Sequence, residues 1–88
     1  MTAVEIPQAW VKVADDASAL SLAHGYHFHG NSGRLVAELR TGAALPAESD
    51  YGVTLASGQT LYPDQLAALG PGALYARALG ESTRLILR

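Results

Sequence analysis

The sequence predicts an all-β protein, a small antiparallel β-sandwich or jelly-roll-like barrel of about seven to eight short strands. Three observations support this prediction. The 88 residues include 9 glycines and 4 prolines, which divide the chain into segments of strand length. Within several segments apolar and polar residues alternate, which is the period of a half-buried strand. Finally, no segment is long enough to be a crossover helix, so the strands are expected to be antiparallel.

The first half of the chain contains four segments with the composition or alternation expected of strands. They are residues 10–13, 19–22, 26–29 and 34–40. Residues 1–8 are expected to form an extended N-terminal arm, and Asp15-Asp16 to form a turn. Gly30-Asn-Ser-Gly33 predicts a hairpin, because glycine and asparagine accept the positive φ of such turns.

The second half is expected to contain two short strands, at residues 51–55 and 59–62. One short helical turn follows near residues 64–69. Asp64 can cap its beginning and Gly70 can end it. A helix of this length can act as a plug or a connector, but it cannot cover a sheet.

The chain closes with two alternating segments, residues 73–79 and 83–88, which we expect to pair through the turn Gly80-Glu81-Ser82. The first segment has a shallow inner face of small side chains, which consists of Leu74, Ala76 and Ala78. On the opposite side, Tyr75, Leu79 and Ile86 leave apolar area. This outer face is expected to contact a second subunit.

The length indicates a single domain over residues 1–88. A domain of this size buries only about 60–65% of the surface of its unfolded chain. The chain has no cysteine, so it contains no disulfide, and much of its apolar content is alanine. We therefore expect oligomerisation to supply further burial, through an interface that contains Trp10, Tyr75, Leu79 and Ile86.

Composition also argues against several classes of function. The net charge of −2 and the single lysine, Lys12, do not provide the clustered cations of a nucleic-acid-binding surface. No apolar run approaches the ~18 residues of a membrane span, and the N-terminus does not resemble a signal peptide. The sequence has no Gly-x-Ser-x-Gly elbow or phosphate-binding loop. We expect a non-enzymatic protein without a cofactor.

Histidines form the most suggestive cluster of potential ligands. His27 and His29 lie two residues apart, so on a strand their imidazoles would share one face, as in sites that bind a metal ion. His24 could supply a third ligand. In a trimer, histidines from several subunits could also meet on the symmetry axis. Alternatively, the strand histidines simply occupy the solvent-facing side of a sheet.

Aromatic residues raise a second possibility, because aromatic faces stack on sugar rings. The candidates are Trp10, Tyr51, Tyr62 and Tyr75. In β-sandwiches, however, aromatic side chains more often lie in the core or anchor an interface.

Three blocks of the chain carry a family resemblance: Ala43-Ala-Leu-Pro46-Ala, Gly52-Val-Thr-Leu-Ala-Ser-Gly58-Gln-Thr-Leu61 and Ala73-Leu-Tyr75-Ala76-Arg77-Ala78. In this order, with the closing apolar strand, they resemble the small β-sandwich structural proteins of tailed bacteriophages and prophages. The resemblance covers residues 10–88. Tyr75 stands where the family often has tryptophan.

The resemblance implies a virion structural protein, made in the cytoplasm of a host bacterium and then located in the virion. Such proteins decorate or cement the capsid, or belong to head fibres or tails. They assemble as homo-oligomers, often trimers, and bind other virion proteins such as the major capsid or tail protein. The alternative function is a small glycan- or receptor-binding β-sandwich module.

Overall fold

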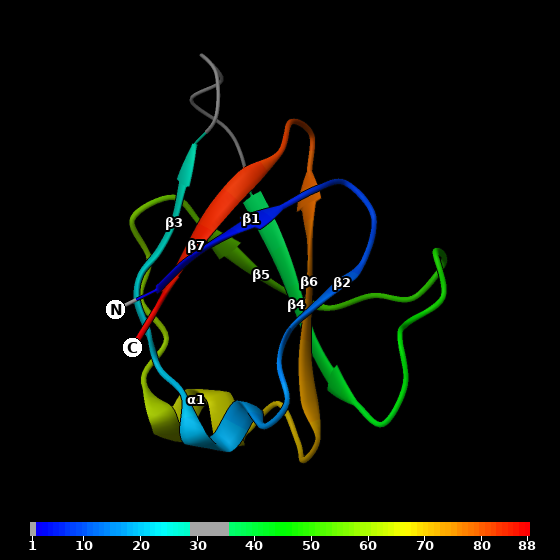
Figure 1. Ribbon diagram of the computed structural model, residues 1–88, viewed down its shortest axis with the longest axis vertical. Helices are drawn as coiled ribbons and strands as arrows, with labels where there is room; N and C mark the ends of the chain where they lie inside the picture. The colour runs from blue at the N-terminus through cyan, green and yellow to red at the C-terminus, as the bar shows by residue number, and fades with distance from the viewer. Residues whose placement is uncertain (1, 29–35) are drawn as a thin grey trace.

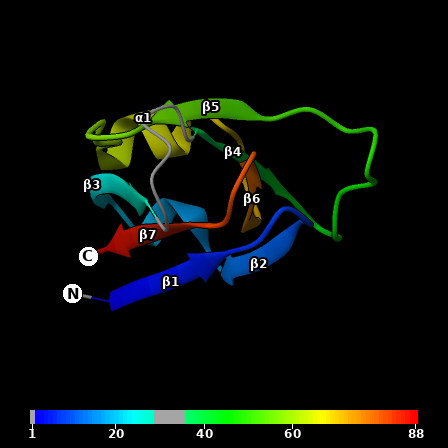
Figure 2. The same ribbon diagram turned by 90° about the horizontal axis from the view of Figure 1, so that it is seen from above.

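The computed structural model describes residues 2–28 and 36–88, and for residues 24–28 it describes the backbone (Figure 1). The elements are β1 (Thr2–Ile6), β2 (Val11–Ala14), the 3₁₀ turn η1 (Ala17–Ala19), β3 (Leu22–Phe28), β4 (Val36–Gly42), β5 (Val53–Ala56), α1 (Pro63–Ala67), β6 (Ala73–Leu79) and β7 (Thr83–Leu87). These strands form two antiparallel sheets, with the orders β1-β7-β3 and β2-β6-β4-β5 (Figure 2). The predicted small all-β fold is confirmed.

The hydrophobic core lies between the two sheets and is built mainly from leucine. Its largest fully buried apolar side chains are Ile6, Leu22, Leu39, Leu55, Leu66, Leu74 and Leu85. Each such side chain contributes about 1.5–3 kcal/mol through its removal from water. The small inner face predicted for residues 73–79 is also confirmed, because Leu74, Ala76 and Ala78 are buried.

The two closing strands, β6 and β7, have the predicted bounds within a residue, but the prediction that they pair was wrong. Strand β6 is bonded to β2 and β4, whereas β7 is bonded to β1 and β3. The connection at residues 80–82 therefore crosses from one sheet to the other. Alternation specifies which face of a strand is buried, and that requirement is met equally by a neighbour in the same sheet or by a strand across the core.

The expected hairpin at residues 30–33 lies outside the described residues. The strands on either side of it are described, and they belong to different sheets: β3 pairs with β7, and β4 pairs with β5 and β6. The pairing that this hairpin implied was therefore wrong for the same reason.

The N-terminal segment is extended, as expected, but it is part of a sheet. Residues Thr2–Ile6 form β1, which pairs with β7 along its whole length, and Ile6 is fully buried. The chain then crosses to the other sheet, where the Pro7 carbonyl accepts a hydrogen bond from the Ala78 N–H over 2.8 Å. An apolar side chain at alternate positions and a paired backbone distinguish this strand from a free arm.

Two of the predicted strands are not strands. The first was predicted at residues 19–22, but the chain there begins with the 3₁₀ turn η1 over Ala17–Ala19. This turn forms because the Asp16 carboxylate accepts a hydrogen bond from the Ser18 N–H over 3.0 Å. Strand β3 begins only at Leu22. In the second, residues 59–62, ladder pairing is limited to a single bridge between Leu61 and Leu22. Local hydrogen bonding by aspartate competes with extended backbone at the first of these sites.

The short helix was predicted at the correct place, and α1 covers Pro63–Ala67. Its N-cap is Tyr62, not Asp64, and the Gln65 side chain accepts from the Tyr62 N–H over 3.0 Å. Gly70 follows the helix with φ of +114°, a conformation that favours glycine. The helix inserts Leu66 into the core and packs beside η1 at one end of the sandwich (Figure 1).

Candidate functional site

The candidate site is built around an ion pair on the outer face of the four-stranded sheet. Glu38 of β4 and Arg77 of β6 are cross-strand partners in register. The Arg77 Nε donates to Glu38 Oε1 over 2.6 Å. Both side chains are largely buried, with exposed fractions of 17% for Arg77 and 9% for Glu38. A pair this well shielded from water interacts more strongly than an exposed one.

The same two side chains hold the β4–β5 loop, residues 43–52, which we call the anchored loop. Arg77 donates from Nη1 to the Glu48 carbonyl over 2.7 Å and from Nη2 to the Asp50 carbonyl over 3.0 Å. The Gly52 N–H donates to the other Glu38 oxygen over 3.0 Å. These hydrogen bonds involve charged groups, which makes them stronger than neutral ones. In Figures 1 and 2 this green loop lies on the side away from β3 and β7.

Further contacts fasten residues 47–52 of the loop. Arg40 donates from Nη1 to the Tyr51 carbonyl over 2.7 Å. Within the loop, the Asp50 carboxylate accepts from the Ala47 N–H over 2.8 Å. At Gly52 the backbone approaches β4 so closely that a Cβ atom would lie 2.5 Å from the Leu39 carbonyl oxygen. Only glycine fits this approach without a shift of main chain.

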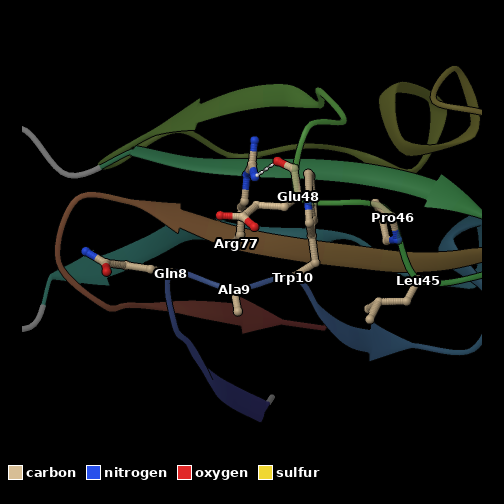
Figure 3. Close-up of a pocket in the computed structure, with 7 residues that line it drawn as sticks. All are labelled: Gln8, Ala9, Trp10, Leu45, Pro46, Glu48 and Arg77. Atoms are coloured by element: carbon tan, nitrogen blue, oxygen red, sulfur yellow. Dashed lines mark hydrogen bonds between the residues drawn. The ribbon is translucent and has the colours of Figure 1, made fainter.

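A pocket with a volume of about 440 Å³ lies where the anchored loop meets the chain before β2 (Figure 3). It is lined by Gln8, Ala9, Trp10, Leu45, Pro46, Glu48 and Arg77. The Arg77 guanidinium stacks over the Trp10 ring, with its carbon 4.7 Å from the ring centroid. In Figure 3 the indole is seen edge-on, with Arg77 on one side and Leu45 and Pro46 on the other. The volume of this pocket is within the range of sites that bind small ligands.

Polar groups of this pocket differ in how far they are satisfied. The Trp10 Nε1 is buried, and Trp10 as a whole is only 7% exposed, but among the described residues this nitrogen has no hydrogen-bond partner. All three guanidinium nitrogens of Arg77 are used by the contacts above. Within residues 2–28 and 36–88, the Glu48 carboxylate has no hydrogen bond or ion pair. In the described part of the chain, the pocket therefore has one cation that is already paired, Arg77, and one anion without a partner, Glu48.

The anchored loop also presents apolar surface. Tyr51 is 81% exposed and lies on backbone that is held by the contacts just described. Leu45 is 60% exposed and lies in the part of the loop that precedes these contacts. Aromatic side chains such as Tyr51 are enriched in the cores of protein–protein interfaces. The sequence indicated Tyr51 as a candidate aromatic binding residue, but it did not indicate the loop surface to which Tyr51 belongs. The signal for it was the charge complementarity of Glu38 and Arg77, which becomes visible only once β4 and β6 are known to be neighbours.

The four residues expected at an oligomer interface do not form one surface within the chain. Trp10 and Tyr75 are already buried, with 7% and 6% exposure. Leu79 is 40% exposed on the outer face of the four-stranded sheet. Ile86 is half-buried on the outer face of the other sheet. Leu79 and Ile86 therefore lie on opposite sides of the sandwich, because β6 and β7 do not pair.

The candidate sugar-binding aromatic residues are likewise separated. Trp10 and Tyr75 are buried, whereas Tyr51 and Tyr62 are exposed. Tyr51 belongs to the anchored loop, and Tyr62 precedes α1. The four rings therefore do not form a single exposed platform.

Of the three histidines, the structure describes the backbone of His24 and His27. His27 is paired in register with Arg84 of β7, and its side chain is not described. The same holds for the His24 side chain, and His29 lies outside the described residues. In the part of the chain that is described, no group of three or more histidine, aspartate or glutamate side chains could hold a metal ion. Metal binding at His27 and His29 stays a prediction.

Comparison with known proteins identifies no relative: no family model, curated protein or solved structure matches the chain. Among the residues described, none of the helices is long and apolar enough to cross a membrane.

Proposed function

We propose that this protein is a non-enzymatic virion structural protein of a tailed phage, an oligomeric β-sandwich that binds the capsid or tail surface through its anchored loop. The observation that carries the proposal is the pair of exposed side chains, Leu45 and Tyr51, on a loop held by Arg40, Glu38 and Arg77. The sequence resemblance to small phage β-sandwich proteins supplies the class of partner.

A preorganised loop is suited to attachment, because it loses little conformational freedom when a partner binds. Exposed aromatic and aliphatic side chains on such a loop can become buried anchors of an interface. Because the core of the domain is small, binding to neighbouring subunits or virion proteins would stabilise its folded state. An attachment loop should be fastened to the sheet before its partner binds. In the free chain, the Arg77–Glu38 ion pair and the bonds from Arg77 to the Glu48 and Asp50 carbonyls provide such fastening.

The direct test is the protein content of purified particles. Particles induced from the bacterium that carries the gene are expected to contain the protein, as detected by mass spectrometry. A variant with Leu45→Ser and Tyr51→Ser is expected to fold but to be reduced in the particles. The matched control is Tyr62→Ser, which removes another exposed ring, outside the loop (exposed fraction 62%). Absence of the unaltered protein from particles would refute the proposal.

The oligomeric part of the proposal has a separate test. Light scattering on the purified protein is expected to show a homo-oligomer, with a trimer favoured. Leu79→Ser and Ile86→Ser, made separately, show which outer face of the sandwich is used, because the two residues lie on different sheets. A fully folded monomer at micromolar concentration would contradict the oligomer.

A further inference from the structure

The pocket beside Trp10 has two ends of different chemistry. At one end Leu45 and Pro46 provide apolar walls, and at the other the Gln8 amide and Glu48 carboxylate provide polar groups. Figure 3 shows these two sets of side chains on opposite sides of the Trp10 indole. A ligand that fills the pocket must therefore have an apolar part and a polar part.

The charge of the polar end follows from the partners of each group. Arg77 is neutralised by Glu38, and its remaining nitrogens are bonded to the carbonyls of Glu48 and Asp50. The Glu48 side chain has no such partner among the described residues. Within residues 2–28 and 36–88, the polar end thus carries a negative charge without a counter-ion, which selects for a cation.

We propose that this pocket receives an extended segment of a partner polypeptide that carries a basic residue and an apolar residue two positions apart. The basic side chain lies at Glu48, and the apolar side chain lies against Leu45 and Pro46. In an extended chain, residues i and i+2 point to the same side and are separated by about 6.5 Å, so both can enter one pocket. The methylene stem of the basic residue packs along the indole edge of Trp10. The inference rests on the proposed attachment function only for the source of this segment.

Trp10 makes the proposal directly measurable, because it is the single tryptophan of the chain. The probe is the capped peptide acetyl-Gly-Lys-Gly-Leu-Gly-amide, titrated into the full-length protein at low salt. We expect a saturable change in tryptophan emission. Two comparison peptides, with glutamate in place of lysine or with serine in place of leucine, are expected to bind more weakly. Equal binding of the lysine and glutamate peptides would overturn the proposal.

Two variants locate the binding. Glu48→Gln removes the charge of a side chain without partners in the described structure, so it leaves the fold intact, and it is expected to weaken binding about two- to fivefold, as for a solvent-accessible ion pair. Leu45→Ser removes an exposed apolar wall and should also weaken it. The matched control, Glu81→Gln in the turn between β6 and β7, should bind as the unaltered protein does. Unchanged affinity in both pocket variants would overturn the proposal.

Other occupants of the pocket give different results. A saturable response to a neutral oligosaccharide, with none to the lysine peptide, would replace the peptide by a glycan and refute the inference. If the protein binds the lysine peptide but is absent from virions, peptide binding in the pocket is supported and the virion role is refuted. If the protein is present in virions but does not respond to the peptide, the virion role is supported and peptide binding in the pocket is refuted.

Discussion

Arg77 reaches across from β6 to Glu38 of β4 and, with the same guanidinium, holds two carbonyl groups of the anchored loop. The ion pair therefore links sheet pairing to loop position. Because Trp10 stacks on the same guanidinium, the pocket, the loop and the sheet share one side chain.

The first prediction concerns this ion pair. Arg77→Leu leaves the Glu38 carboxylate largely buried without its cation, so we expect the free energy of unfolding to fall by about 3–5 kcal/mol. The double variant Arg77→Leu with Glu38→Leu is expected to lose less than the two single variants together, because no unpaired charge remains. Urea unfolding followed by circular dichroism measures both. Additive losses would show that the two side chains act independently.

The second prediction concerns the approach of the loop to β4. A methyl group at position 52 would meet the Leu39 backbone at 2.5 Å, so Gly52→Ala is expected to displace the loop and to weaken the bond from its N–H to Glu38. We expect a loss of about 1–3 kcal/mol in the free energy of unfolding. Gly42→Ala is the matched control, because its added Cβ would lie an ordinary 3.8 Å from the Ala44 carbonyl oxygen. Equal losses in the two variants would contradict this account.

A third prediction tests the pairing of β1 with β7. Glu5 and Arg84 are cross-strand partners, and their side chains approach each other, with Arg84 Nη2 3.6 Å from Glu5 Oε1. The chain has no other cysteine, so Glu5→Cys with Arg84→Cys should form one intramolecular disulfide. It should raise the free energy of unfolding by about 4 kcal/mol, since it closes a long loop.

The reduced form of the same variant is the control for this disulfide. If residues 1–8 were a free arm, the oxidised and reduced forms would be equally stable in thermal melts. A disulfide that forms only between molecules would also contradict the register.

The fourth prediction is a titration. The Lys12 ammonium lies 2.8 Å from the Asp15 carboxylate, and this hydrogen bond and the attraction of charges lower the pKa of Asp15 below its ordinary value of 3.8. A lowered folded-state pKa means that the pair stabilises the fold above the unfolded-state pKa. That contribution is lost as the pH falls through the folded-state value.

The measurement is an NMR titration of the Asp15 carboxyl in the unaltered protein and in Lys12→Met. The variant should return the Asp15 pKa toward its ordinary value. Because both groups are exposed, little change in stability is expected at neutral pH. An unchanged Asp15 titration would show that the pair does not form in solution.

Local patterns were sufficient to predict the strand at residues 73–79, its inner face of Leu74, Ala76 and Ala78, and the short helix before Gly70. These features depend on side chains close in sequence: a period of two for a buried face, and proline and glycine at the ends of a helix. The all-β class follows from the same information.

Tertiary structure decided which strands are neighbours, and with them the site. Pairing of β6 with β4, and not with β7, brings Glu38 to Arg77 and places Leu79 and Ile86 on opposite faces. A period of two is satisfied equally by a hairpin or by two strands that face each other across a core. Only the packing of the whole chain, in which each sheet covers the apolar face of the other, selects between them.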